Sequence, residues 1–306
     1  MLASALAASG VQASRSTPIV DTHQHLWDLK RLSLPWLPTS GPLAGDHRLE
    51  DYIREADGLG ITRTLYMEVD VAPEQHEAEA AYALERCGAP GSPMIGAILG
   101  GRPDSPDFEA YVTRFRRELR VRGLRQVLHS AATPQGHCLQ PAYIAGIRLL
   151  GRMRLVFDIC LPAPFLDDAR QLADACPDTR FVLDHCGNPN VQEGPADSWR
   201  RAIDAVARRK NVACKISGIV ATARRGAWAA EDLAPFIEHC RAAFGPDRIL
   251  FGSDWPVCTM VASLREWVTA LQRIVAGWPD DERRKLFSQN AVRWYGLSRL
   301  LSGSAA

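Results

Sequence analysis

Short apolar runs recur eight times along this chain of 306 residues, and each is followed by a stretch with the composition of a helix. The spacing between runs suits a strand–helix unit. Eight strands that alternate with helices predict an α/β fold with a parallel sheet, and eight units are the number that closes a (β/α)8 TIM barrel. We expect the strands at residues 18–25, 62–70, 93–100, 121–128, 154–160, 180–186, 211–218 and 248–254.

Helices are expected in the gaps between these runs. An open, doubly wound sheet is the alternative α/β arrangement, but it usually carries a glycine-rich turn after its first strand, and the sequence has none at that place. The segment 27–48, rich in Pro, Trp and Gly, is too long for an ordinary loop, so we expect it to fold over the mouth of the barrel. The predicted helices lie at 73–88, from 106 onwards, and at 140–150, 166–175, 197–209, 231–244, 262–275 and 280–294.

No linker interrupts this pattern, so it predicts a single domain. We place the barrel at 18–297, between a disordered N-terminal tail at 1–17 and a C-terminal tail at 298–306. The first 16 residues are small and rich in Ser and Ala, and a truncated signal peptide is the alternative interpretation. They lack the basic start of such a peptide, which favours a tail.

The composition indicates which classes of partner the protein is expected to bind. The net charge of +1 provides no strong field for nucleic acid or an anionic membrane, and no apolar run approaches the about 20 residues that span a bilayer. The eight cysteines form no C-x-x-C pair, which argues against a zinc knuckle and favours a reducing compartment, the cytoplasm. We expect a small-molecule substrate, no nucleic acid and no membrane. A homo-oligomer is compatible with the sequence.

Two histidines end the first predicted strand. Alternation along a strand places His23 and His25 on one face, with Asp21 one step behind them on the same face. The eighth strand ends at Asp254, and closure of the barrel makes the first and eighth strands neighbours. The carboxylate of Asp254 is therefore expected beside the histidine pair, at the end of the barrel where such folds place their chemistry.

The sixth strand adds a third imidazole. Alternation predicts that His185 faces inward and that Asp184 faces the helices. His23, His25, His185 and Asp254 would then converge. Such a set could hold one divalent ion, Zn²⁺ or Mn²⁺, and it could equally act as a metal-free acid/base cluster.

Other strand ends carry charged side chains that could contact a substrate. Arg125 and Lys215 are candidates for holding its hydroxyl or carboxylate groups. Glu68 and Asp158 belong to the same set, and His129 follows Arg125 on the same face. The alternative is that the two cations form structural ion pairs with the two acids.

Three tryptophans flank the predicted site in the sequence, namely Trp27, Trp36 and Trp255. A sugar ring often packs on an indole face, and this would make them substrate contacts. Packing of the loop over the barrel explains them almost as well.

Four motifs resemble those of the amidohydrolase superfamily, and specifically its amidohydrolase family 2 branch of sugar-lactone and pyrone-dicarboxylate lactonases. The resemblance runs from about residue 18 to about 297. It implies a (β/α)8 barrel whose strand-eight Asp activates water, with Asp254 at that position, His23 and His25 as the strand-one pair, and His185 as the strand-six His. The motifs are DTHQHLWD (21–28), LDHCGNP (183–189), CKISG (214–218) and FGSDWPV (251–257).

The sequence departs from this superfamily at two positions. Members with two metal ions have a Lys or Glu on strand four and a His at the end of strand five. This chain has Arg125 and Asp158 on those strands. A two-metal site is therefore not expected, and because some lactonases of the branch work without metal, the resemblance implies one ion or none.

We expect hydrolysis of a lactone, namely an aldonolactone or a related cyclic ester of a sugar acid or pyrone. Asp254 is the expected general base, and His23, His25 and His185 would polarise the carbonyl, directly or through one ion. A zinc-dependent non-oxidative decarboxylase of the same superfamily is the alternative. A third hypothesis is a non-catalytic barrel that binds a sugar acid.

Overall fold

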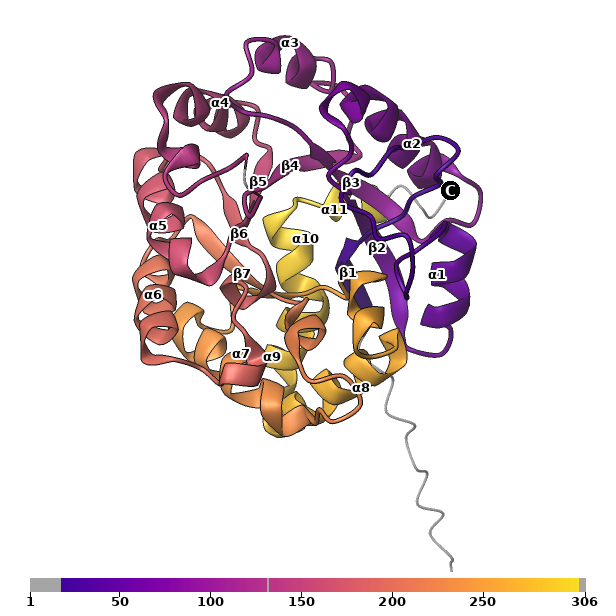
Figure 1. Ribbon diagram of the computed structural model, residues 1–306, viewed down its shortest axis with the longest axis vertical. Coiled ribbons are helices and arrows are strands. Elements are labelled where there is room, and N and C mark those ends of the chain that lie inside the picture. The colour runs from indigo at the N-terminus through magenta and orange to yellow at the C-terminus, as the bar shows by residue number, and fades with distance from the viewer. Residues whose placement is uncertain (1–17, 131, 303–306) are drawn as a thin grey trace, which may run out of the picture.

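Eight parallel strands form the centre of the molecule and pair in the order in which they occur in the chain (Figure 1). The computed structural model describes residues 18–130 and 132–302. The first and last strands also meet, because the backbone N–H of Asp254 donates to the carbonyl of His23 (2.8 Å). This confirms the predicted TIM barrel. The strands are β1 Ile19–Gln24, β2 Ile61–Met67, β3 Met94–Gly100, β4 Val121–Val127, β5 Val156–Cys160, β6 Phe181–Leu183, β7 Val212–Ile216 and β8 Ile249–Phe251.

A helix follows each strand and packs on the outside of the barrel, and Figure 1 shows these helices as an outer ring. The predicted helices are present, and α1 and α11 are additional. The helices are α1 Leu49–Ala56, α2 His76–Gly88, α3 Phe108–Thr113, α4 Pro141–Arg152, α5 Leu166–Ala175, α6 Asp197–Ala207, α7 Ala230–Phe244, α8 Leu264–Ile274, α9 Asp280–Arg284, α10 Asn290–Trp294 and α11 Ser298–Ser302.

Apolar side chains fill the inside of the barrel away from the site. They come from strands around the ring and pack against Trp294 of α10 and the adjacent Tyr295. Because this end is closed by apolar packing, the polar interior lies at the other end of the strands. The inner core from the strands consists of Val20, Leu65, Met67, Ile98, Val156, Val182, Ala213 and Leu250.

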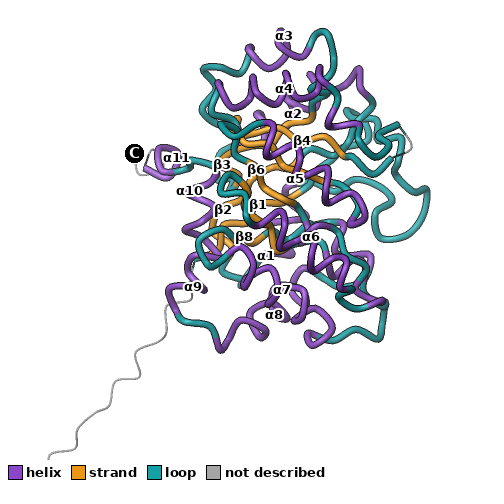
Figure 2. Tube along the Cα trace, turned by 90° about the vertical axis from the view of Figure 1, so that its left-hand side faces the viewer, coloured by secondary structure: helices purple, strands orange, loops and turns teal. Residues whose placement is uncertain are grey.

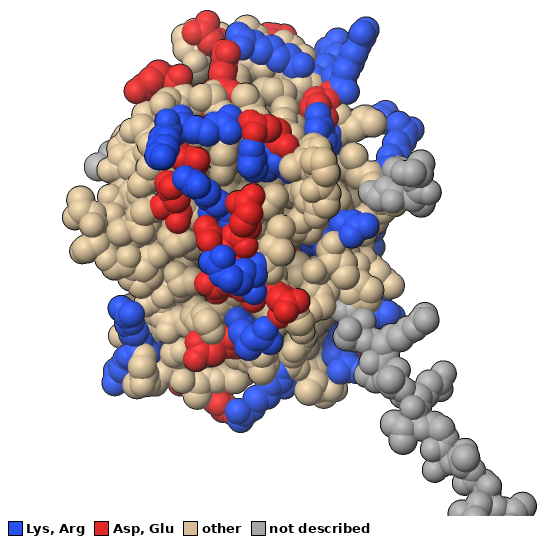
Figure 3. Space-filling view, turned by 90° about the vertical axis from the view of Figure 1, so that its right-hand side faces the viewer, with Lys and Arg blue, Asp and Glu red and all other residues tan. Residues whose placement is uncertain are grey.

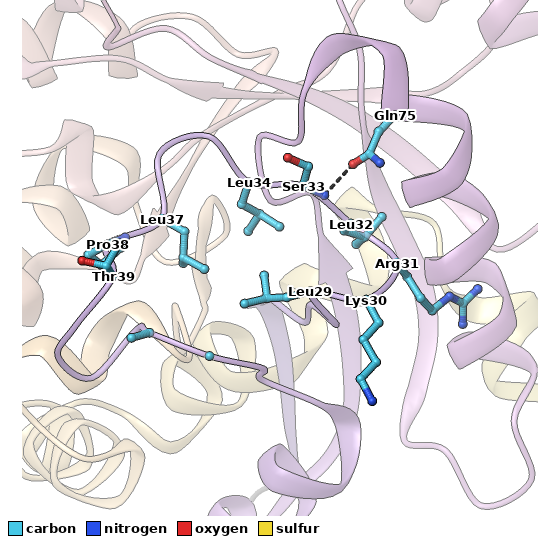
Figure 4. Close-up of a pocket in the computed structure, with 12 residues that line it drawn as sticks. Leu29, Lys30, Arg31, Leu32, Ser33, Leu34, Leu37, Pro38, Thr39 and Gln75 are labelled. Atoms are coloured by element: carbon cyan, nitrogen blue, oxygen red, sulfur yellow. Dashed lines mark hydrogen bonds between the residues drawn. The ribbon is translucent and has the colours of Figure 1, made fainter.

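The long segment after β1 folds across the carboxyl ends of the strands, as predicted. Trp27 and His47 bridge its two ends, and Trp36 donates from Nε1 to the carbonyl of Val69 (2.7 Å). The segment lines an open pocket of about 580 Å³, around which Leu29, Leu34 and Leu37 lie (Figure 4). This pocket is lined by the segment itself and Gln75, and it contains none of the predicted histidine–aspartate residues.

The long loops and the last helix lie at opposite ends of the barrel (Figure 2). The helix α11 occupies the start of the segment predicted as a C-terminal tail, and the predicted N-terminal tail at 1–17 lies outside the described residues. Acidic and basic side chains alternate over the face drawn in Figure 3. Among the described residues, no helix is long and apolar enough to span a bilayer.

Candidate active site

Three imidazoles and one carboxylate converge at the carboxyl ends of the strands. The Nε2 atoms of His23 and His25 lie 3.1 Å apart. Oδ1 of Asp254 lies 3.5 Å from Nε2 of His23, 3.3 Å from that of His25 and 4.0 Å from that of His185. All four residues are buried or nearly so. The structure therefore brings together the residues for which the sequence predicted a catalytic role.

The backbone around Asp254 is shaped for this convergence. A side chain at Gly252 would place its Cβ only 2.7 Å from the Cβ of His23, so the strand must carry glycine there. Asp254 itself has a left-handed backbone conformation (φ 58°), and so does His185 (φ 55°). Such conformations cost non-glycine residues about 1–3 kcal/mol and cluster at functional sites. They turn both side chains over the end of the barrel.

Asp184 lies on the inner side of the barrel wall, and the prediction that it faces the helices is wrong. Val182 belongs to the inner core, so alternation along β6 carries Asp184 to the same side. Its carboxylate lies 3.0 Å from Nζ of Lys215 and 3.5 Å from Nη1 of Arg125. Regular alternation would then turn His185 away from the site. It reaches the site because its left-handed backbone breaks the alternation.

Asp21 does not project with the two histidines, contrary to the sequence prediction. The register of β1 against β2 shifts between Asp21 and Gln24, and this shift breaks the expected alternation. The carboxylate of Asp21 accepts hydrogen bonds from Tyr52 of α1 (2.7 Å) and from the backbone N–H groups of His23 (3.0 Å) and Ser253 (2.8 Å). Asp21 therefore fixes β1 against α1 and the residues after β8.

Arg125 is held by a buried carboxylate. Its Nε donates to Oε1 of Glu68 (2.6 Å), and its Nη2 donates to the carbonyl of the same residue (2.8 Å). Burial opposes ionisation of Glu68, but the adjacent Arg125 prevails and lowers its pKa. The remaining Nη1 of Arg125 lies 3.2 Å from Nε2 of His23. The structural ion pair considered from the sequence is thus present, and it directs one guanidinium nitrogen at the histidine cluster.

Lys215 is the centre of a second buried network. Its Nζ lies 2.5 Å from Asp158, 3.0 Å from Asp184 and 3.3 Å from Nδ1 of His23. Tyr295, below the barrel, donates to the same Asp158 oxygen (2.7 Å). Burial raises the pKa of Asp158 to about 7, although Lys215 opposes the shift. Burial lowers the pKa of His23 well below its usual value. The charge of Asp184 opposes this shift and the charge of Lys215 adds to it, so His23 is neutral near pH 7.

The other two histidines are oriented by groups behind them. Nδ1 of His25 lies 3.1 Å from the carbonyl of Met67, which fixes the proton on Nδ1 and leaves Nε2 as an acceptor. Nδ1 of His185 lies 2.8 Å from the hydroxyl of Ser217. A Cβ at Gly218 would lie 2.3 Å from the same nitrogen. The Ser-Gly pair of the third motif therefore packs against His185, a role that the sequence analysis missed.

The aromatic candidates differ in their access to a substrate. Trp27 and Trp255 are fully buried, and both rings pack against His47, which favours packing of the loop over a role as sugar platforms. Trp36 keeps 40% of its surface exposed at the rim. His129 is also exposed, and desolvation together with the nearby Arg125 guanidinium lowers its pKa.

The cluster fits one divalent ion. Ligand atoms about 2.1 Å from a tetrahedral Zn²⁺ lie roughly 3.4 Å apart, and the distances from Asp254 to the Nε2 atoms of His25 and His185 bracket that value. The carbonyl behind His25 is the type of partner that orients a metal-binding imidazole. Nη1 of Arg125 lies close enough to Nε2 of His23 to compete with an ion for that nitrogen. The guanidinium also occupies the place on strand four where a second ion would bind. Ligand atoms of His23, His185 and Asp254 all lie within 4.8 Å of one another, and Nε2 of His25 lies 3.3 Å from Asp254, so these four residues are the candidate ligands.

A buried acid outside the predicted set supports this wall of the site. Glu79 of α2 accepts hydrogen bonds from the backbone N–H of Val69 (2.7 Å) and the hydroxyl of Tyr66 (3.1 Å). Burial, with Glu68 nearby, raises the pKa of Glu79 from 4.5 to about 8. Glu79 lies in a helical run rich in Ala and Glu, where the sequence gives no sign that this one acid is buried. It is protonated at neutral pH.

We expect Glu79→Gln to stabilise the protein at high pH. The pKa of Glu79 is higher in the folded protein than in the unfolded chain. This difference contributes stability that is complete below about pH 4.5 and is lost as the pH rises through about 8. The difference of about 3.5 pH units corresponds to roughly 5 kcal/mol. Gln mimics the protonated acid, so the gain in unfolding free energy should grow between pH 5 and 8. Chemical denaturation measures it, with exposed Glu74→Gln as control; equal pH slopes in wild type and variant would contradict the prediction.

Comparisons with known proteins agree with this geometry. An L-fucono-1,5-lactonase of Burkholderia multivorans is 31% identical over 299 residues, covering 91% of this chain and 96% of that protein. A second L-fucono-1,5-lactonase, from Burkholderia ambifaria, is 26% identical over 292 residues, covering 92% and 96%. A crystal structure of an amidohydrolase from Burkholderia multivorans with bound Zn has a TM-score of 0.81 at 26% identity, covering 91% of this chain and 99% of that one.

The Amidohydro_2 family model, described as amidohydrolase, matches residues 20–297. The match covers the eight strands, apart from Ile19 at the start of β1, and the histidine–aspartate cluster at their carboxyl ends. This chain therefore belongs to the amidohydrolase 2 family of TIM-barrel hydrolases.

Proposed function

We propose that the protein hydrolyses a lactone, most specifically an uncharged aldonolactone or a related cyclic ester of a sugar acid. The observation that carries this proposal is the position of Asp254, a carboxylate at a strand end with three imidazoles within 4.0 Å of one of its oxygens. Ester hydrolysis needs a base for water and donors for the oxyanion, and this cluster combines both. The names of the two Burkholderia relatives support the lactone class.

In this mechanism Asp254 accepts a proton from a water molecule, and the water oxygen attacks the lactone carbonyl carbon. Negative charge develops on the carbonyl oxygen, where Nε2–H of His185 can stabilise it in the tautomer whose Nδ1 accepts from Ser217. The cations of Arg125 and Lys215 can stabilise the same oxygen. Collapse of the tetrahedral intermediate breaks the ring C–O bond. Asp254 then returns its proton to the departing alkoxide, which yields the open hydroxy acid and restores the carboxylate.

The neutral His23 has a distinct place in this scheme. The cations of Arg125 and Lys215 face its two ring nitrogens at 3.2 and 3.3 Å. A neutral imidazole has a single acceptor nitrogen, so at most one of the two cations donates to it. Both concentrate positive potential beside the position of the oxyanion. A divalent ion held by this histidine–aspartate cluster would supply Lewis-acid polarisation of the carbonyl when bound.

The pairing of the buried cations supports an uncharged substrate. Arg125 is matched by Glu68, and Lys215 is matched by Asp158 and Asp184. Because these carboxylates already satisfy both cations, a substrate carboxylate at this depth would meet an excess of negative groups. Hydroxyl groups of a sugar lactone carry no such penalty.

The test is a panel of aldonolactones and anionic lactones, with acid release followed in weak buffer. We expect turnover of neutral aldonolactones by the wild type and its loss in Asp254→Asn. Release of CO₂ from aromatic carboxylic acids is measured in parallel, because it would identify the decarboxylase alternative. Tight binding of a sugar acid without turnover of any lactone would refute the enzymatic proposal.

His185→Asn should lower turnover without unfolding the protein. The imidazole lies at the rim of the site, so we expect a loss of at least about 100-fold in kcat, the scale of a lost oxyanion stabiliser. The unfolding midpoint should change little, or rise because a strained site is relieved. Steady-state kinetics and thermal unfolding measure the two effects. His239→Asn, on α7, is the control, and an unfolded His185→Asn protein would mean that His185 is a core residue.

A further inference from the structure

Three buried cysteines meet on the outer side of the barrel wall. Cys186 follows His185 in the short helical turn η4 (His185–Gly187), Cys214 lies on β7, and Cys240 lies on α7. Their Sγ atoms all lie within 4.8 Å of one another. Each side chain is fully buried. Segments that are distant in the sequence thus deliver three thiols to one point.

The cluster is separated from the active site by the barrel wall. Ala213 packs in the inner core and Lys215 faces the site, so Cys214 between them points outward to α7. The sulfur atoms of Cys186 and Cys214 approach the same backbone carbonyl, that of Lys215, at 3.9 and 4.0 Å. The thiols therefore lie directly behind the residues that carry Lys215 and His185.

The geometry suits an ion with three sulfur ligands. An ion bonded to three thiolates at about 2.3 Å in one plane holds them about 4 Å apart, a separation that the 4.8 Å limit of this cluster includes. Structural Zn²⁺ is almost always four-coordinate, and the described residues provide three ligand atoms here. Soft thiolate ligands select Cu⁺, which accepts a three-coordinate site.

We propose that Cys186, Cys214 and Cys240 form a binding site for one soft, thiophilic metal ion, of which Cu⁺ is the best fit. This site is distinct from the histidine–aspartate cluster, whose nitrogen and oxygen ligands suit a harder ion. The bound ion joins η4, β7 and α7. Because His185 and Lys215 are adjacent in sequence to two of its ligands, the ion fixes the backbone from which these two residues reach the active site.

The test is a Cu⁺ titration of the full chain under anaerobic conditions, against a chelator of known Cu⁺ affinity. The wild type should take up one Cu⁺, with only sulfur in its first shell by X-ray absorption spectroscopy. Its thermal unfolding midpoint should rise with Cu⁺, because a ligand that binds the folded state stabilises it. Cys240→Ala and Cys214→Ala should each lower the affinity at least about 100-fold and abolish the shift in midpoint.

Two other buried cysteines provide matched controls. Cys138→Ala removes a buried thiol that is not part of the cluster, and Cys160→Ala removes a thiol within 4.8 Å of ligand atoms of Asp184 and His185. Both variants should bind Cu⁺ as the wild type does. Cys240→Ser replaces Cys240→Ala if the latter fails to fold. Absence of tight uptake by the wild type, uptake that survives loss of Cys240, or uptake lost only with Cys160 would each overturn the proposal.

Discussion

Asp254→Asn is expected to reduce kcat for lactone hydrolysis by about 10² to 10⁴, the range for loss of a positioned general base. Asn keeps the shape of the side chain and removes its ability to accept a proton from water. The carboxylate lies within 4.0 Å of three imidazoles, and no other acid is so close to all of them among the residues that the structure describes. Substrate affinity should change little, because the sugar hydroxyls would be bound by other groups.

The metal content of Asp254→Asn distinguishes a metal-ligand role of Asp254 from a general-base role. If Asp254 acts chiefly as a metal ligand, Asp254→Asn should lose a bound ion, and added Zn²⁺ or Mn²⁺ should restore part of the rate. If it acts as the base, metal content stays as in the wild type and added ions restore nothing. Asp247→Asn, at the exposed opposite end of strand eight, is the control. Near-wild-type turnover by Asp254→Asn would place the base elsewhere.

The period of the apolar runs was enough to predict the barrel. Strands buried on both faces read as short apolar runs, and eight of them with helical spacers permit few topologies. Motif positions then located His23, His25, His185 and Asp254, because parallel strands end at one face. Helix α1 was missed because it has only eight residues and its N-cap is Arg48, not one of the usual capping residues, although Glu50 and Asp51 lie in its first turn.

The errors lie where the backbone departs from a regular strand. Asp21 was assigned to the wrong side because alternation was extended through a register shift. Asp184 was assigned to the wrong side because the phase of β6 was set from His185, which lies past the end of that very short strand. The left-handed backbone at His185 cannot be read from residue type, since His favours that conformation only modestly. Ion pairing between strands depends on closure of the barrel, so the sequence offered it only as an alternative.

That pairing leads to a large expected effect on stability. Lys215→Met keeps most of the side-chain volume but removes the cation between Asp158 and Asp184, and all three residues are fully buried. Breaking a buried pair leaves uncompensated charge and typically costs about 3–5 kcal/mol. We expect a loss of that size in the free energy of unfolding at neutral pH, measured by chemical denaturation. Exposed Lys210→Met, just before the same strand, should change it by less than about 0.5 kcal/mol.

The pH dependence and a second substitution separate this structural role from substrate binding. Burial raises and Lys215 lowers the pKa of both carboxyls, so loss of Lys215 raises both pKa values above those in the wild type. Lys215→Met should therefore lose most stability at high pH and recover as the pH falls and the carboxyls protonate. Adding Asp158→Asn should restore part of the loss, because one unpaired charge is removed. If Lys215 instead served mainly to hold the substrate, Lys215→Met would raise KM, leave the free energy of unfolding unchanged, and show no recovery with Asp158→Asn.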